Sequence, residues 1–291
     1  MKTLADLHLH SKVSDGINTP GELVAMAAKT ELGGIALTDH DTLDGISEFV
    51  GIDAPEWLSR IPGVEISTVF KGRETHILGY FVRDNAQKLR RRLRYLEETR
   101  RTRFPKMVRR LNDIGIEISK KELDSVLEGV TAPGRPHLAR LLVVKGFVKD
   151  EVEAFDVYLG EGKPAYVEKK MIETREAIDL LRAESAVPVL AHPLTMGSSD
   201  LRSDLLELKR AGLLGVEVNY AYDHTYTHTT SGQVREVADG LGLIATGGSD
   251  HHGDNSRSSI GQVTVSIDVI DALRDAAESL GSDRIDWSPH S

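Results

Sequence analysis

Short apolar segments recur along the chain, and most of them carry a histidine or a carboxylate at or near one end. Each segment is rich in Leu, Ile, Val or Ala and is bounded by Gly, Pro or charged residues, a pattern typical of buried β-strands. We expect strands at 4–10, 34–40, 61–65, 75–82, 187–192, 215–220 and 243–250.

Segments with helical periodicity separate these strands. Thr19, Pro20 and Glu22 form the signature of a helix start, with a capping box and a proline in the first turn. The alternation of strands and helices predicts an α/β fold with a largely parallel sheet, and about seven strands suit a barrel. We expect further helices at 173–184, 201–211, 232–241 and 267–280.

The stretch 84–170 interrupts this alternation, because it contains helix patterns and little strand. Leu89, Leu93 and Leu96 have the spacing of an amphipathic helix. Pro105 is expected to kink or divide that helical stretch. We therefore predict a helical insertion between two strands of the α/β domain.

The insertion is strongly basic, whereas the chain as a whole is acidic. Residues 88–110 include eleven Lys and Arg against Glu97 and Glu98. One interpretation is a solvated helix face, and the other is a basic surface close to an anionic substrate. The whole chain has 36 Lys and Arg against 45 Asp and Glu, a net charge of −9, which excludes a general binder of duplex DNA or anionic lipid.

Composition narrows the class of protein further. The chain has 291 residues, 40% of them hydrophobic and 28% charged, as expected for a soluble globular protein of one or two domains. It contains no cysteine, which excludes disulfides, thiolate metal sites and a cysteine nucleophile. No segment has the apolar core of a signal peptide or the roughly 20 apolar residues of a membrane span, so we expect a soluble, cytoplasmic protein.

Eleven histidines are the clearest chemical signal in the composition. His8 and His10 alternate with leucines on a predicted strand, so both imidazoles project from the same face. Asp250 and His252 repeat this spacing at the end of another strand. Imidazole pairs of this kind suit Zn²⁺, Mn²⁺ or Fe²⁺.

Other metal-ligand residue types stand at the ends of further predicted strands. His40, Glu65 and His192 each follow an apolar run. Asp15 and His76 would carry little weight singly, but they add to the same set. Because the ends of barrel strands build active sites, we expect these side chains to form one metal cluster.

These motifs together resemble the PHP (polymerase and histidinol phosphatase) family. Within the family, the chain is similar to metal-dependent phosphoesterases that act on nucleoside 3′,5′-bisphosphates and short oligonucleotides, and segments 134–140 and 163–167 share in that resemblance. The matching motifs are Asp6-Leu7-His8-Leu9-His10-Ser11, Ser14-Asp15-Gly16, Thr38-Asp39-His40-Asp41-Thr42, Gly63-Val64-Glu65-Ile66, His76-Ile77-Leu78-Gly79, Ala191-His192-Pro193 and Gly248-Ser249-Asp250-His251-His252-Gly253.

The resemblance implies a distorted (β/α)7 TIM-like barrel made of residues 1–83 and 171–291, with residues 84–170 as a helical insertion that caps the substrate. It also implies two to three divalent metal ions, which the ligand types suggest are Mn²⁺, Fe²⁺ or Zn²⁺. By position, the first metal would be held by His8, His10, Glu65 and Asp250, the second by Glu65, His76 and His192, and the third by Asp15, His40 and His252.

The ligand types also suggest a mechanism. Two metals that share Glu65 can hold a bridging water and lower its pKa, so that hydroxide attacks the phosphorus near neutral pH. Glu65, His8, His10 and Asp250 are therefore the expected catalytic group, and no protein nucleophile is required. Three nearby carboxylates would either orient His40 or act in turns and helix caps: Asp39, Asp41 and Asp44.

The insertion is expected to select the substrate. Arg135 stands next to Pro136 at an expected helix start, where backbone N–H groups favour anions, and arginine matches the geometry of phosphate. Ordinary surface ion pairs are the alternative role for these cations. The expected substrate-binding residues are Arg135, Arg140, Lys163 and Tyr166.

The predicted activity is hydrolysis of a nucleotide phosphomonoester, such as the 3′-phosphate of 3′-phosphoadenosine 5′-phosphate. One alternative is a 5′→3′ exonuclease that acts on short oligonucleotides. Another is a histidinol phosphate phosphatase, which the arginine-rich insertion disfavours. A non-catalytic metal-binding module is the last alternative, and the complete ligand set argues against it. The expected partner is a small phosphorylated molecule or a short single strand, with no duplex nucleic acid and no membrane.

Overall fold

The computed structural model of the protein describes residues 2–222, 229–253 and 258–281. Within these residues the strands are β1 (Leu4–Leu9), β2 (Leu32–Leu37), β3 (Ser59–Phe70), β4 (Arg73–Tyr80), β5 (Ile172–Glu173), β6 (Val187–Leu190), β7 (Gly215–Asn219), β8 (Ile244–Gly247) and β9 (Val265–Ser266).

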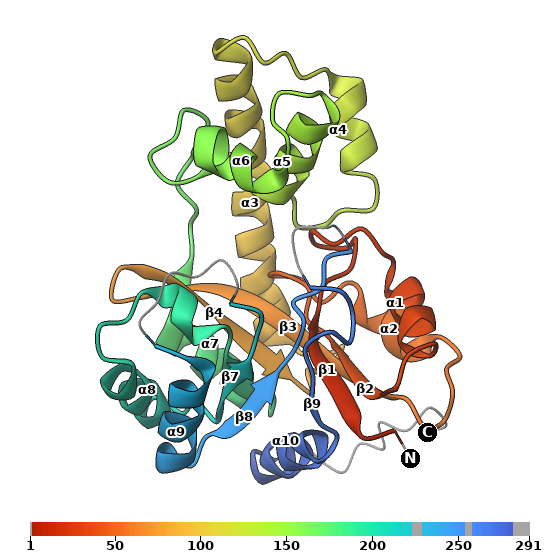
Figure 1. Cartoon of the computed structure of the whole chain (residues 1–291), viewed down its shortest axis with the longest axis vertical. Helices are drawn as coiled ribbons and strands as arrows, with labels where there is room; N and C mark the ends of the chain where they lie inside the picture. The colour runs from red at the N-terminus through yellow and green to blue at the C-terminus, as the bar shows by residue number, and fades with distance from the viewer. Residues whose placement is uncertain (1, 223–228, 254–257, 282–291) are drawn as a thin grey trace.

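All of these strands belong to one sheet, in the order β8-β7-β6-β4-β3-β2-β1-β9, with β5 beside β3. The sheet curls into a nearly closed barrel (Figure 1), which confirms the predicted α/β barrel. β1, β2 and β3 are parallel to one another, and so are β6, β7 and β8. Two places in the order depart from the expected parallel arrangement: β4 at the centre is antiparallel to both β3 and β6, and the short edge strand β9 is antiparallel to β1.

A tight turn causes this reversal. Lys71 and Gly72 join β3 to β4, and both have positive φ, 52° and 75° respectively. Two-residue turns with positive φ match the twist of antiparallel strands. The hairpin therefore places the polar residues of β3 and β4 side by side.

The barrel closes where the residues after β8 meet β1. Gly248 lies so close to His8 that a Cβ at position 248 would fall 2.4 Å from the His8 backbone nitrogen. The buried carboxylate of Asp6 accepts hydrogen bonds from the Ser249 N–H (2.9 Å), the Ser249 hydroxyl (2.6 Å) and the Gly261 N–H (2.8 Å). One carboxylate on β1 thus holds both the end of β8 and the segment that leads to β9.

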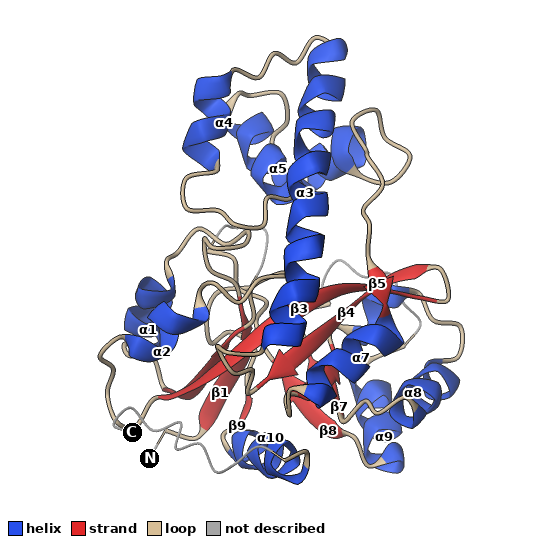
Figure 2. Ribbon diagram, turned by 180° about the vertical axis from the view of Figure 1, so that it is seen from behind, coloured by secondary structure: helices blue, strands red, loops and turns tan. Residues whose placement is uncertain are grey.

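Helices cover the outside of the barrel (Figures 1 and 2). The predicted start of the first helix is confirmed, because the Thr19 side chain accepts a hydrogen bond from the Glu22 N–H and the Glu22 carboxylate accepts one from the Thr19 N–H. Aliphatic side chains fill the space between these helices and the sheet. The outer helices are α1 (Pro20–Ala27), α2 (Ile46–Gly51), α7 (Thr174–Ala183), α8 (Leu201–Arg210), α9 (Ser231–Leu241) and α10 (Asp268–Ser279).

Between β4 and β5 the chain forms a helical layer that stands above the barrel (Figure 1). Its longest helix, α3 (Gln87–Asp113), continues through Pro105, so the prediction that this proline divides the helix is wrong. Pro105 lies on the exposed face of α3, where water can bind the carbonyl that loses its N–H partner. The other elements are α4 (Lys120–Val126), α5 (Arg135–Val144), α6 (Glu151–Ala154) and a π-helical turn at Phe155–Leu159.

The inner face of α3 joins this layer to the barrel. Phe104 and Leu138 belong to an apolar core that α3 and α5 share. One turn away, the buried Arg100 donates from Nε to Asp41 Oδ2 (2.8 Å) and from a terminal nitrogen to the Ser67 hydroxyl (3.0 Å). Charge-assisted hydrogen bonds in a buried site fix the orientation of both partners, so α3 has a defined position over β3.

In the part of the chain that the structure describes, no helix combines the length and the apolarity needed to cross a bilayer.

Replacing Asp6 with Ala should lower the free energy of unfolding by about 3 kcal/mol, because the N–H groups of Ser249 and Gly261 lose a buried acceptor. Urea denaturation of the metal-free protein measures this change. Asp179→Ala is the matched control, since Asp179 is exposed and forms a surface ion pair with Arg175, and it should cost less than about 0.5 kcal/mol. Equal stability of Asp6→Ala and the parent would contradict the role of Asp6 at the closure.

Candidate metal centre

The candidate ligands converge at one end of the barrel from strands spread over most of the chain. Two of them, His192 and Asp250, have positive φ (25° and 53°), and strained backbone of this kind clusters at functional sites. The residues that come together are His8 (β1), His10 (after β1), Asp15 (the next loop), His40 (after β2), Glu65 (β3), His76 (β4), His192 (after β6), and Asp250 and His252 (after β8).

The buried carboxylate of Glu65 stands in the middle of this group. Both of its oxygens face imidazole nitrogens. These nitrogens belong to five histidines that lie in or just after four different strands. Oε1 lies 2.8 Å from His76 Nδ1 and 3.0 Å from His192 Nε2, and Oε2 lies 3.1 Å from His10 Nε2, 3.1 Å from His40 Nδ1 and 3.3 Å from His8 Nε2.

A second close contact joins the two histidines of β1. The Nε2 atoms of His8 and His10 are 3.1 Å apart, as expected from their shared face of the strand. Asp250 Oδ1 lies 3.1 Å from His10 Nε2 and 3.5 Å from His8 Nε2. Two imidazole nitrogens at this distance must share a proton or a cation, because two lone pairs or two protons would repel each other.

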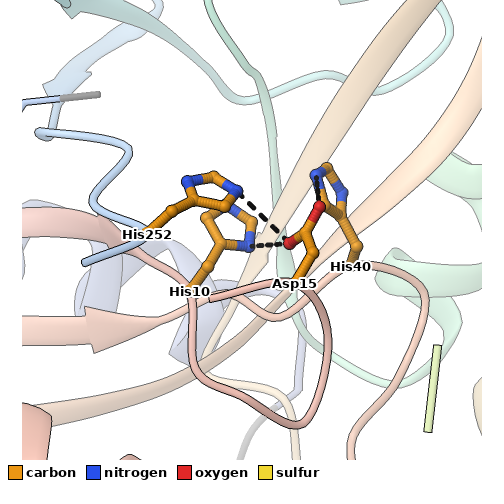
Figure 3. A group of neighbouring side chains, drawn as sticks. All are labelled: His10, Asp15, His40 and His252. Carbon is orange, nitrogen blue, oxygen red and sulfur yellow. Dashed lines mark ion pairs between the residues drawn. The ribbon is translucent and has the colours of Figure 1, made fainter. Parts of the chain in front are cut away.

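Asp15 gathers another set of imidazoles (Figure 3). Its Oδ1 lies 3.2 Å from His252 Nε2 and 3.8 Å from His10 Nδ1, and its Oδ2 lies 3.8 Å from His40 Nε2. All four side chains are buried. The loop after β1 thus adds one carboxylate to the edge of the cluster.

The donors fit divalent metal ions. Glu65 Oε2 and the Nδ1 atoms of His10 and His40 are buried, yet they form no hydrogen bond within the described part of the chain. Buried polar atoms of this kind require another partner, and a bound ion is one. Imidazoles mixed with carboxylates suit Mn²⁺, Fe²⁺ or Zn²⁺. The sets whose donor atoms lie close enough to hold one ion are His10, Asp15, His40 and His252; His8, His10, Glu65 and Asp250; and His40, Glu65 and His76.

The cluster shifts the pKa values of its own members. Burial alone would raise the pKa of Glu65, but the neighbouring imidazoles, His40 and His76 foremost, hold it well below its ordinary value. Burial alone would lower the pKa of His10, but the neighbouring carboxylates of Asp250 and Glu65 raise it to about 9. Without metal, the site therefore contains ionised carboxylates and protonated imidazole.

Contacts outside the cluster orient the histidine rings. Glu217 Oε1 lies 2.9 Å from His8 Nδ1, and Thr195 Oγ1 lies 2.9 Å from His192 Nδ1. His252 Nδ1 lies 2.7 Å from a backbone carbonyl. In each case Nε2 is the nitrogen that faces the cluster, and such outer partners fix which ring nitrogen is free to bind a metal. Glu217 was not expected from the sequence, although a single acid within the apolar strand β7 was a usable signal.

The carboxylates expected to orient His40 contact other groups instead. Asp39 accepts hydrogen bonds from the Ser11 N–H and hydroxyl, both at 2.7 Å, and thereby orders the loop after β1. Asp41 binds Arg100 of α3, and the side chain of Asp44 is about half exposed. These residues therefore act in turns and in attachment of the insertion.

Arg135 lies on the insertion side of the cluster, at the start of α5. Its guanidinium packs over the rings of Phe155 (5.3 Å) and Tyr166 (5.9 Å). A terminal nitrogen of Arg135 is 3.8 Å from Glu74 Oε2. The structure thus brings two of the expected substrate-binding residues, Arg135 and Tyr166, against each other.

The other two expected substrate-binding residues lie apart from this pair. Arg140 donates a hydrogen bond to the backbone carbonyl of Asp15 and lies 3.6 Å from Glu151, so it packs α5 against the loop after β1. Lys163 is exposed, and its backbone N–H donates a hydrogen bond to the Gly160 carbonyl.

Further cations, which the sequence did not single out, surround Glu74. Lys169 Nζ lies 2.7 Å from Glu74 Oε1, and this oxygen is 3.4 Å from His76 Nε2. Arg103 is buried, and one of its terminal nitrogens has no hydrogen-bond partner among the residues described. Burial and the nearby Arg135 lower the pKa of Arg103 to about 10. Of these cations, only Arg103 lies in the basic segment 88–110, and only the composition of that segment pointed toward it.

Comparison with known proteins agrees with the geometry. The PHP domain model matches residues 6–131. The chain is 34% identical over 220 residues to a 5′-3′ exoribonuclease of Haemophilus influenzae, covering 73% of this chain and 78% of that protein. It is 32% identical over 255 residues to a 3′,5′-nucleoside bisphosphate phosphatase of Chromobacterium violaceum, covering 85% and 86% respectively. Its fold matches a protein from Bifidobacterium adolescentis described as a metal-dependent phosphoesterase, with a TM-score of 0.84, 26% identity, and coverage of 94% of this chain and 96% of that one.

The barrel, the clustered donors and these relatives together define a metal-dependent phosphoesterase, an enzyme that hydrolyses phosphoric esters. The chain belongs to the PHP (polymerase and histidinol phosphatase) family.

Glu65→Gln should weaken Mn²⁺ binding by about 100-fold or more, because it removes the charge that faces imidazoles on both sides. Metal content after dialysis, measured by mass spectrometry, and competition with a chelator check this. Glu207→Gln, at an exposed position that pairs with Lys71, is the matched control and should bind Mn²⁺ like the parent. Unchanged binding by Glu65→Gln would show that the carboxylate is not a ligand.

Mn²⁺ binding should strengthen as the pH rises and should release protons. The pKa of His10 in the metal-free fold, about 9, exceeds its ordinary value of 6.5, so a proton that stabilises the metal-free fold at neutral pH must leave before a metal binds. Affinity should rise about tenfold per pH unit for each displaced proton and level off above about pH 9. Calorimetry at several pH values, in buffers of different ionisation enthalpy, measures both quantities. A Kd that does not change from pH 6.5 to 8.5 would contradict this expectation.

Proposed function

We propose that this protein removes a phosphate from a nucleotide, and that its substrates are nucleoside 3′,5′-bisphosphates from which the 3′-phosphate is released. The clustered donors support two to three divalent metal ions. In this proposal the first metal is held by His8, His10, Glu65 and Asp250, the second by Glu65, His76 and His192, and the third by Asp15, His40 and His252.

When bound, the metals would supply an activated water and neutralise charge on the phosphate. The protein contributes the fixed positions of the donors. Glu65 presents Oε1 to His76 and Oε2 to His8, so it lies between the first two ligand sets. Because the donors are buried and oriented beforehand, little reorganisation is needed when charge develops on the reacting group.

The observation that carries the choice of a bisphosphate is the excess of positive charge on the insertion side. Arg103 and Arg135 are neighbours, and Lys169 adds a third cation, with Glu74 as the carboxylate they surround. Glu74 in turn touches His76, so these cations adjoin the metal ligands. Guanidinium groups bind phosphate oxygens in pairs, and a second phosphate would supply the missing acceptor for Arg103.

A 5′→3′ exonuclease that acts on short oligonucleotides is the second candidate. The exposed arginines of α3 favour this candidate, because each further phosphate of an oligonucleotide can bind a further cation and so raise the affinity. The relative from Haemophilus influenzae carries that activity in its name. A histidinol phosphate phosphatase fits less well, since that substrate has one phosphate and a cation. The exposed arginines of α3 are Arg91, Arg94, Arg101, Arg109 and Arg110.

The direct test measures hydrolysis with Mn²⁺, as phosphate release from adenosine 3′,5′-bisphosphate and adenosine 3′-monophosphate and as mononucleotide release from a 5′-phosphorylated trinucleotide. We expect the highest kcat/KM on the bisphosphate. A higher kcat/KM on the trinucleotide, with mononucleotides as products, would select the exonuclease. Failure to hydrolyse any of the three with Mn²⁺, Fe²⁺ or Zn²⁺ would overturn both.

Arg103→Met should lower kcat/KM for adenosine 3′,5′-bisphosphate by about 10- to 100-fold, because a charge-assisted hydrogen bond to the second phosphate is lost. The same variant should change kcat/KM for adenosine 3′-monophosphate by less than about threefold, since that nucleotide has no second phosphate. Arg109→Met, on the exposed face of the same helix, is the control and should change neither value. Equal losses on both nucleotides would contradict this role of Arg103.

A further inference from the structure

Glu217 is a fully buried carboxylate that touches two candidate ligands from outside the cluster. It lies in the middle of β7 between Val216 and Val218, which pack in the core between the sheet and the outer helices. By strand alternation Glu217 therefore points into the barrel. Its Oε1 lies 2.9 Å from His8 Nδ1, and its Oε2 accepts a hydrogen bond from the His192 N–H at 2.8 Å.

Both of these contacts need an acceptor on Glu217. The His192 N–H belongs to the backbone and is a fixed donor. When His8 Nδ1 donates to Glu217, His8 Nε2 keeps its lone pair for a metal, and this atom faces Glu65 Oε2 at 3.3 Å. His192 Nε2 faces the other oxygen of Glu65 at 3.0 Å. One carboxylate thus fixes a ligand on each side of Glu65.

We propose that Glu217 is a positioning residue that sets the metal affinity of the first and second ligand sets together. This inference rests on the proposed metal centre and adds to it a residue that binds no metal itself. The hydrogen bond from the His192 N–H to Glu217 matters in particular, because the His192 backbone is strained, with a φ of 25°, and depends on neighbouring groups to hold it.

Replacing Glu217 with glutamine tests the proposal directly, because an amide has the shape of a carboxylate but different hydrogen-bonding groups. In the Glu217→Gln variant, the side-chain amide would offer one acceptor and one donor in the same space. The His192 N–H cannot stop donating, so it takes the acceptor, and the amide NH₂ then faces His8 Nδ1. His8 must now accept at Nδ1 and carry its proton on Nε2. With that proton in place, Nε2 cannot bind a metal.

The test compares Glu217→Gln with Glu217→Asp in the full-length protein. The Kd for Mn²⁺ is measured by competition with a fluorescent chelator at one pH. We expect Glu217→Gln to raise the Kd by about 10- to 100-fold, as loss of such outer partners does. Glu217→Asp keeps two acceptors and should raise it less than about tenfold. A role limited to filling space predicts the reverse order, because Gln has the size of Glu whereas Asp leaves a cavity.

Controls separate the possible outcomes. Glu236→Gln, at an exposed position on α9, should bind Mn²⁺ like the parent. Circular dichroism of the metal-free variants establishes whether they fold. If Glu217→Gln does not fold, Glu217→Asp decides: a Kd within tenfold of the parent supports the inference, and a larger increase overturns it. Equal Kd values for the parent and Glu217→Gln overturn the inference alone, whereas a parent that binds no Mn²⁺ removes the proposed metal centre as well.

Discussion

The buried carboxylate of Glu65 faces a group of closely spaced imidazoles, and the surrounding architecture must bring these imidazoles to it. Its two oxygens face five histidines that lie in or just after β1, β2, β4 and β6. These histidines reach one carboxylate only because the curled sheet brings the ends of their strands together. The closure at Asp6 and Gly248 therefore serves the site as much as the fold, because it brings the end of β8 against His8.

Local patterns were enough to predict the strands and helices of an α/β fold whose strand number suits a barrel, and the family resemblance implied the barrel itself. The alternation around His8 and His10 encodes a strand with two imidazoles on one face, and the capping box at Thr19 encodes a helix start. Contacts between distant segments could not be predicted in this way. Glu217 looks like any acid in a strand until the strand across the barrel is known to present His8. Likewise, only the Lys71 turn, seen in three dimensions, explains why β4 runs against its neighbours.

The helical insertion divides its positive charge between two faces of one helix. On the inner face of α3, Arg100 binds Asp41 and thereby holds the insertion to the barrel. Arg103, one turn further, is buried beside Arg135. The outer face carries arginines that water solvates. The interpretation as a solvated surface thus holds for the outer face of α3, whereas the buried inner face is the one that the proposed function assigns to an anion.

The order of the ligands along the chain has a consequence for how the enzyme acquires its metals. They run from His8 to His252, and the sets around Asp15 and around His8 both need residues that follow β8. A nascent chain therefore holds no complete copy of either set until the segment with Asp250 and His252 has left the ribosome. Once the barrel has formed, a metal that binds only the folded state adds about 4 kcal/mol to the free energy of unfolding at a concentration 1,000-fold above its Kd. Bound metal would thus add to the stability of the folded chain only after the segment that carries Asp250 and His252 has been made.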